Sequence, residues 1–238
     1  SYINSKFRLF RLQKKNDYAF INDNLKKIYK KNGYLGKLIS IKNKKNYKIT
    51  SKVDNEYLRS YANIENLNFV YSLAKILNIS KNSFFKSINT FKGLPHRHEI
   101  FLKKRNITFI NDSKATTLQA AKYALASNKN IYWIVGGLPK YKDKINLSSL
   151  KKNIVKSYII GKDIRFFKKL LKNKIKFSVS KNIKTAIIKI LRDIRSSTIK
   201  KNTIILCPGA ASFDQFKNFE IRGEKFKKLS KFYAKKFL

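Results

Sequence analysis

The stretch ITFINDSKATTLQAAKYALASNKNIYWIVGG, residues 107–137, decides the fold. It begins with a β-rich run at Ile107–Ile110, continues with apolar residues at helical spacing over Lys114–Ala126, and ends in a second β-rich run at Ile131–Val135. A strand, a helix and a strand in this order are typical of a unit with two parallel strands and a right-handed crossover. The stretch therefore predicts a parallel sheet.

The same alternation continues to the end of the chain. Further strands are predicted at Ser157–Ile160, Lys176–Val179 and Thr203–Leu206. Further helices are predicted at Leu147–Val155, Ile164–Leu171, Ile183–Ile194 and from about Asp214 to the last residue. The pattern predicts an α/β fold with a Rossmann-like, doubly wound and mostly parallel sheet that has helices on both faces. Ligands of such sheets bind at the carboxyl ends of the strands.

The first part of the chain has a different pattern. A strand is predicted at Tyr18–Ile21, and a polar stretch rich in Lys and Asn follows it to about Asn55. One helix is predicted from an apolar stripe of Leu67, Val70, Leu73, Ala74 and Leu77. A second helix is predicted to begin near Ser80. Because Lys92-Gly93-Leu94-Pro95 breaks the helical pattern, we expect two domains, residues 1–92 and 93–238.

Composition limits the possible functions. The 238 residues include 55 Lys+Arg and 13 Asp+Glu, for a formal net charge of +42. The basic residues are dispersed along the chain and no nucleic-acid-binding motif is present, so we expect no specific nucleic-acid partner. A single Cys indicates a reducing compartment, and no apolar run is long enough to cross a bilayer, so we expect a cytoplasmic protein with no membrane insertion. Since the chain contains no Met, we expect it to be a fragment of a longer protein.

Three segments are dense in specific polar groups: GLPHRHE (residues 93–99), NDSKATT (111–117) and PGAASFDQF (208–216). The second and third each follow a predicted strand and precede a helix, where backbone N–H groups and the helix dipole favour an anion. There Asp112 is suited to a ribose, Lys114 to a phosphate or acyl phosphate, and Thr116 to a carboxylate. The alternative is that Asp112 or Ser113 only caps the helix.

These segments resemble the Mur ligases. GLPHRHE, NDSKATT, GGLPK (136–140) and CPGAASFDQFKNFEIRGEKF (207–226) agree with that family in order and spacing, and YINSKFRLF (2–10) is similar to a segment of its central domain, so the resemblance covers the whole chain. It implies that residues 1–92 are part of a central ATP-binding domain and that residues 93–238 are the domain that binds the incoming amino acid. The implied activity is an ATP-dependent addition of D-glutamate to UDP-N-acetylmuramoyl-L-alanine through an acyl phosphate, in peptidoglycan synthesis, by a monomeric enzyme.

The resemblance also implies roles for individual residues. Lys6 is similar to a catalytic lysine that is carbamylated by CO2 and binds Mg2+. Lys114 is similar to a second catalytic lysine, which also matches a position that holds D-glutamate. The residues that resemble an ATP site are Asn63, Asn66, His96, Arg97 and Asp112. The residues that resemble a D-glutamate site are Thr116, Lys140, Ser212 and Phe219. For Phe219, a place in the core of the last helix is an equal alternative.

The chain has no phosphate-binding loop of the form G-x-x-x-x-G-K-[ST], since Gly33-Tyr34-Leu35-Gly36-Lys37-Leu38 has the wrong spacing. We therefore expect the chain alone not to turn over ATP. Two other functions stay open at this point. One is a sibling ligase that adds a different amino acid or extends folate with glutamate. The other is a basic module that binds polyanions on a degenerate ligase fold.

Overall fold

The computed structural model describes residues 2–42, 52–55, 58, 61–140 and 142–238. The chain forms two compact units, Ser1–Lys92 and Gly93–Leu238. The assignment of each unit to a domain of a ligase stays a prediction. Residues 43–51 of the polar Lys/Asn-rich stretch lie outside the described residues. Among the described helices, none is both long enough and apolar enough to span a membrane.

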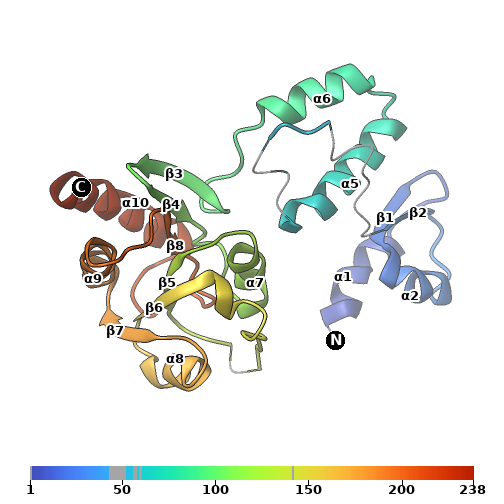
Figure 1. Ribbon diagram of the computed structural model, residues 1–238. Helices are drawn as coiled ribbons and strands as arrows, with labels where there is room; N and C mark the ends of the chain where they lie inside the picture. The colour runs from blue at the N-terminus through green and yellow to red at the C-terminus, as the bar shows by residue number, and fades with distance from the viewer. Residues whose placement is uncertain (1, 43–51, 56–57, 59–60, 141) are drawn as a thin grey trace. The chain divides into compact units, whose positions relative to one another are not determined.

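The C-terminal unit is built on a six-stranded sheet (Figure 1). Its strands are β3 (Glu99–Lys104), β4 (Ile107–Asn111), β5 (Ile131–Gly136), β6 (Ile154–Ile160), β7 (Phe177–Lys181) and β8 (Asn202–Leu206). Their order in the sheet is β3-β4-β8-β5-β6-β7. The edge strand β3 is antiparallel to β4, and every other pair is parallel. This topology confirms the predicted α/β fold with a mostly parallel sheet.

Helices cover both faces of this sheet (Figure 1). They are α7 (Leu118–Ala126), α8 (Ile164–Leu171), α9 (Ile183–Arg195) and α10 (Phe219–Phe237). Trp133 packs with α7 and α8 in one core, whereas the adjacent Tyr132 packs with α9 and α10 in the other. Consecutive strand residues point to opposite faces, so β5 needs large apolar side chains at successive positions.

The N-terminal unit is smaller, and its hydrophobic clusters contain fewer buried residues. Its elements are α1 (Tyr2–Arg11), β1 (Tyr18–Asn22), η1 (Asp23–Leu25), α2 (Lys26–Lys31), β2 (Lys37–Ile41), α5 (Tyr61–Ile76) and α6 (Lys81–Thr90). Strands β1 and β2 are parallel and pack with α1 around Phe7, Ala19 and Tyr29. Helices α5 and α6 share a separate cluster that includes Leu67 and Phe84. The two clusters hold far fewer buried residues than the cores of the C-terminal unit.

One predicted helix is wrong. Residues Leu147–Val155 form turns, a short 3-10 helix η2 (Lys151–Asn153) and the start of β6. Leu147, Leu150 and Ile154 have the spacing of a helix face and are buried, but Leu147 and Leu150 lie in irregular structure and Ile154 begins β6. The amide of Asn153 donates to the carbonyl of Leu125, and β6 pairs with β5 from Ile154 onward and with β7 from Ser157 onward. Pairing within the sheet thus overrides the local helical pattern.

Two helices begin later than predicted because side chains cap them. Helix α7 begins at Leu118 rather than Lys114, and the Thr117 hydroxyl accepts from the backbone N–H of Ala120. Helix α10 begins at Phe219 rather than Asp214, and the Asn218 side chain accepts from the backbone N–H of Ile221. The residues before each cap are left as loops at the edge of the sheet.

Candidate functional site

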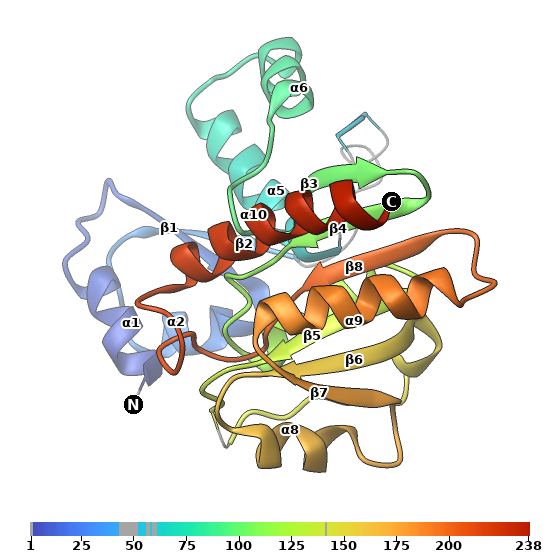
Figure 2. The same ribbon diagram turned by 90° about the vertical axis from the view of Figure 1, so that its left-hand side faces the viewer.

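Three loops meet at one edge of the C-terminal sheet. Residues 112–117 follow β4, residues 137–140 follow β5, and residues 207–218 follow β8. Since β4, β8 and β5 are adjacent and parallel, the carboxyl ends of all three lie at the same edge (Figure 2). We call this edge, with its three loops, the rim. Asp112, Lys140 and Ser212 each lie in one of these loops.

Backbone hydrogen bonds connect the three loops of the rim. The N–H of Gly209 donates to the carbonyl of Ala115 at 2.9 Å. Leu138 and Ala211 exchange two hydrogen bonds, at 2.9 and 3.0 Å. Gly137 permits this approach because it has φ of +136° and a Cβ there would lie 2.3 Å from the carbonyl oxygen of Ala211. The rim is therefore a connected surface rather than three independent loops.

A buried arginine reinforces these connections. Arg222 of α10 is 1% exposed. Its Nε and Nη2 donate to the hydroxyl and the carbonyl of Ser113 at 3.0 and 2.8 Å, and its Nη1 donates to the carbonyl of Ala210 at 3.0 Å. Burial lowers the pKa of Arg222 to about 10, and the nearby Asp214 opposes that shift, so the guanidinium stays charged at neutral pH. Arg222 was not among the site residues predicted from the sequence.

Lys114 and Phe219 lie together on the rim. The Nζ atom of Lys114 is 3.9 Å from the centroid of the Phe219 ring. The hydroxyl of Ser113 donates to the carbonyl of Phe219 at 2.8 Å, which fixes the first turn of α10 to the loop after β4. Both side chains are half-buried. Phe219 therefore lies at the rim, although it begins the helix whose later residues fill the core.

Asp112 is half-buried at the end of β4. Its carboxylate accepts from the backbone N–H of His98 at 3.0 Å and from the thiol of Cys207 at 3.4 Å. Burial raises the pKa of Asp112 to about 6. The two hydrogen bonds and the charge of the exposed Arg97 act in the opposite direction and lower the pKa, but burial has the larger effect. Asp112 does not cap α7, because Thr117 is the N-cap and Asp143 accepts from the N–H of Leu118.

His96 and His98 have different surroundings. The side chain of His96 is buried; its Nδ1 lies 2.9 Å from the Asn111 amide nitrogen and its ring meets Phe219 edge to face. Gly223 leaves room for this ring, since a Cβ there would lie 2.2 Å from Nδ1 of His96. Burial lowers the pKa of His98. Whether His96 meets an adenine ring stays a prediction.

The remaining residues predicted for D-glutamate differ in exposure. Lys140 is exposed, Thr116 is half-buried, and Ser212 is 2% exposed. The backbone N–H groups at the start of α7 are less available than the sequence suggested, because Thr117 and Asp143 accept from two of them. Side chains, more than the start of this helix, are therefore the polar groups available to an anion in this loop.

The other predicted residues lie in the N-terminal unit. Lys6 is exposed on α1, and Asn63 and Asn66 lie one turn apart on α5, with the amide of Asn66 3.5 Å from the side-chain oxygen of Asn63. Within the described part of the chain, no group of three or more His, Cys, Asp or Glu side chains is placed to hold a metal ion. Lys6 would become an oxygen ligand only as a carbamate, so these residues do not complete a magnesium site.

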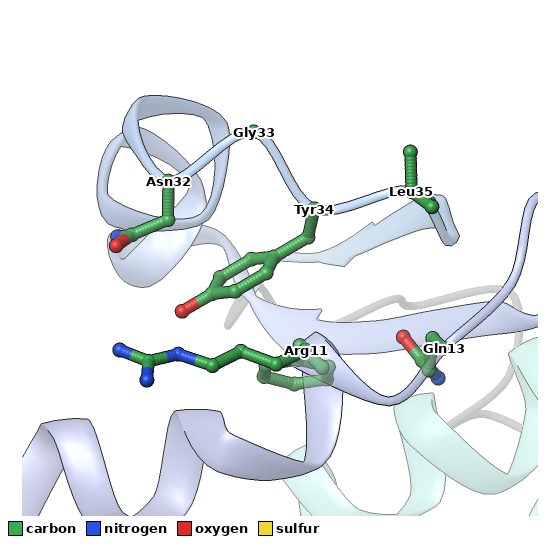
Figure 3. A pocket seen from close by; sticks show the side chains of 7 residues that line it. Arg11, Gln13, Asn32, Gly33, Tyr34 and Leu35 are labelled. Carbon is green, nitrogen blue, oxygen red and sulfur yellow. The ribbon is translucent and has the colours of Figure 1, made fainter.

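An open pocket of about 360 Å³ also lies in the N-terminal unit (Figure 3). Figure 3 shows the side chain of Arg11 extending beneath the ring of Tyr34, with Asn32 above its guanidinium end. The pocket lies beside the start of β2, and none of the residues predicted for a site lines it. We assign it no role.

The sequence of the chain was compared with those of known proteins. No protein-family model matches the chain. The chain is 37% identical over 177 residues to a UDP-N-acetylmuramoylalanine--D-glutamate ligase of Rickettsia felis, a match that covers 74% of this chain and 39% of that protein. It is 36% identical over 186 residues to the ligase of the same name from Wolbachia pipientis wMel, covering 75% of this chain and 36% of that protein. The chain thus spans about two fifths of the length of these relatives.

Solved structures agree on the fold. The MurF ligase of Thermotoga maritima in complex with ADP superposes with a TM-score of 0.66 at 12% identity, covering 98% of this chain and 57% of that one. A murein peptide ligase from Psychrobacter arcticus superposes with a TM-score of 0.53, covering 95% of this chain. At this identity, these two structures show the fold of the chain. The likeness in sequence, at 36–37% identity, makes the chain similar to the Mur ligases, and the two relatives named above are UDP-N-acetylmuramoylalanine--D-glutamate ligases.

Proposed function

We propose that the complete product of the gene encoding this chain is an ATP-dependent ligase that adds D-glutamate to UDP-N-acetylmuramoyl-L-alanine in peptidoglycan synthesis. The observation that carries the proposal is the rim, where Asp112, Lys114, Lys140 and Ser212 lie in loops connected by hydrogen bonds. The named relatives add support, because they match the chain over three quarters of its length. We further propose that the enzyme acts in the cytoplasm as a monomer.

In the proposed reaction, the terminal phosphoryl group of ATP passes to the carboxylate of UDP-N-acetylmuramoyl-L-alanine, which becomes an acyl phosphate while ADP leaves. The amine of D-glutamate then attacks the acyl carbon, an amide bond forms, and phosphate leaves. Arg97 is exposed beside Asp112, so the guanidinium is available to phosphate oxygens. We propose that Asp112 binds the ribose. Lys114 would stabilise the negative charge that develops on the transferred group.

For D-glutamate, we propose that Lys140, Thr116 and Ser212 hold the two carboxylates and so direct the amine. These residues come from all three loops of the rim. An amino acid with two carboxylates needs at least two such contacts to fix its orientation. In the N-terminal unit, Asn63 and Asn66 are proposed to meet the nucleotide.

We keep Mg2+ and a carbamylated Lys6 within the proposal, because phosphoryl transfer commonly uses a divalent ion. The described residues do not complete a site for that ion, so no step is assigned to it. Mass spectrometry of the protein in bicarbonate buffer tests Lys6 directly. A carbamate adds the mass of CO2 to the peptide that carries Lys6, and Lys6→Arg abolishes the adduct.

The experiment that tests the proposed function is phosphate release by the complete gene product, measured with ATP, UDP-N-acetylmuramoyl-L-alanine and each of several amino acids. We expect release that depends on both acceptor and D-glutamate. Release with a different amino acid would instead support a sibling ligase. Absence of release, together with binding of polyanions that disappears at a few hundred millimolar salt, would support the polyanion-binding alternative.

A further inference from the structure

We propose that Phe219 is a positioning residue, whose ring holds the Lys114 ammonium at the rim. The proposal rests on the proposed function for its catalytic meaning, although the contact itself does not. The distance of 3.9 Å from Nζ to the ring centroid is well within the range in which an aromatic face attracts a cation.

The two partners are fixed from several directions. The Ser113 hydroxyl, one residue before Lys114, donates to the carbonyl of Phe219 at 2.8 Å. Arg222, one turn further along α10, donates to the hydroxyl and the carbonyl of the same serine at 3.0 and 2.8 Å. The backbone N–H of Lys114 donates to the carbonyl of His96 at 3.0 Å. The backbone on both sides of the contact is therefore held in place.

The chemistry of the contact suits a lysine that must meet an anion. Among the described residues, no carboxylate lies within ion-pair distance of Lys114. A carboxylate would fix the ammonium but would also cancel its charge. An aromatic ring attracts the cation through its quadrupole and adds no negative charge, so the ammonium keeps its full charge for a phosphoryl group.

This role differs from packing against the apolar stem of D-glutamate. A ring that binds the substrate stem stabilises the ground state and the transition state alike, and its loss raises KM. A ring that positions Lys114 stabilises only the charge of the transition state, and its loss lowers kcat. The two roles are therefore separable by kinetics.

The first measurement is NMR of this chain with labelled lysines, which needs no catalytic activity. A methylene next to an ammonium that sits over a ring is shifted upfield by the ring current. The signal of Lys114 is assigned as the one lost in Lys114→Arg. We expect it upfield in the wild type and in Phe219→Tyr, and at an ordinary lysine position in Phe219→Leu. An unchanged signal in Phe219→Leu would overturn the proposal.

The second measurement is steady-state kinetics of the complete gene product. Phe219→Leu should lower kcat by about tenfold while KM for D-glutamate changes by less than about threefold, which corresponds to loss of a partly buried cation–π contact. Phe219→Tyr, which keeps the aromatic face, should recover kcat. Phe213→Leu serves as the matched control, because Phe213 is in the same loop region and is 71% exposed.

A rise in KM for D-glutamate with kcat unchanged in Phe219→Leu would overturn the positioning role in favour of substrate binding. Equal activity of Phe219→Leu and the wild type would overturn it as well. If the wild-type protein shows no ligase activity, the proposed function fails, whereas the NMR comparison still decides whether the ring holds Lys114.

Discussion

The two units of this chain carry their site residues in different structural settings. In the C-terminal unit, five of the residues predicted from the sequence lie in loops that follow buried strands, namely Asp112, Lys114, Thr116, Lys140 and Ser212, and two large cores fix those strands from both faces. In the N-terminal unit, Lys6, Asn63 and Asn66 lie on helices packed over small separate clusters. The difference shows that a site is well determined where loop ends are anchored in a large core.

The largest expected effect concerns the independent stability of the two units. We expect residues 93–238 to fold alone, because this unit contains two complete cores on the faces of its sheet. Residues 1–92 alone should be largely unfolded, since their buried clusters are too small to offset the loss of chain entropy. Circular dichroism of the two separately produced segments during urea unfolding checks both expectations. A cooperative transition of residues 1–92, without one of residues 93–238, would reverse the comparison.

The next effect concerns the buried arginine of the rim. Arg222→Met keeps much of the side-chain volume but leaves the carbonyls of Ser113 and Ala210 without their donors. We expect the free energy of unfolding of the C-terminal unit to fall by about 3 kcal/mol, because buried acceptors without partners cost about 1–3 kcal/mol each. Urea unfolding of the whole chain provides the measurement.

Arg195→Met is the control for this substitution, because Arg195 is exposed on α9. Its effect should stay within about 0.5 kcal/mol. If both variants lose the same stability, Arg222 does not connect the loops in the way described.

Asp112 is expected to make the stability of the C-terminal unit depend on pH. Because burial raises its pKa from 3.8 to about 6, the folded state binds the proton more tightly than the unfolded state does. The contribution of Asp112 to stability is therefore complete below about pH 4 and is lost as the pH rises through about 6. Asp112→Asn removes this dependence.

The measurement is urea unfolding of the wild type and Asp112→Asn at several pH values. Relative to the wild type, the variant should gain about 1–3 kcal/mol between about pH 4 and about pH 8. A difference between the two proteins that does not change with pH would show that the Asp112 carboxyl is not desolvated.

The smallest effects concern helix caps, one in each unit. Ser80 accepts from the backbone N–H of Ser83 at the start of α6, and Asn182 accepts from that of Thr185 at the start of α9. Replacing either residue by Ala should cost about 1 kcal/mol. Hydrogen exchange locates each loss: Ser80→Ala should weaken protection in α6 only, and Asn182→Ala in α9 only. Spread of either effect into the other unit would show that the two units unfold together.

Much of the C-terminal fold was predictable because its inner strands are runs of β-branched and aromatic residues, such as Ile131–Val135, separated by helical patterns. The edge strand β3 was missed because charged residues alternate with apolar ones only partly along Glu99–Lys104, and it pairs on one side. Strand β2 was missed because it lies within a polar Lys/Asn-rich stretch. Each of these strands is completed by pairing on one side, β3 with β4 and β2 with β1.

The candidate site was partly predictable for a similar reason. Asp112, Lys114 and Ser212 follow strands, and the end of a parallel strand is a position that the sequence reveals. Arg222 was missed because an arginine in an amphipathic helix is usually exposed. A signal was present, since Arg222 shares one stripe of α10 with the buried Phe226 and Ser230. The contact between Lys114 and Phe219 depends on tertiary packing and has no signal in the sequence.

The most direct test of the central claim, that the rim binds the incoming amino acid, is steady-state kinetics of Lys140→Ala in the complete gene product. A charge-assisted hydrogen bond to a carboxylate contributes about 1.5–3 kcal/mol, so kcat/KM for D-glutamate should fall by at least about tenfold while the KM for ATP changes little. Lys114→Ala, measured in the same assay, should lower kcat by a larger factor than it raises the KM for D-glutamate. Equal losses for ATP and D-glutamate in both variants would contradict the account, because they would show that these lysines support the fold rather than the site.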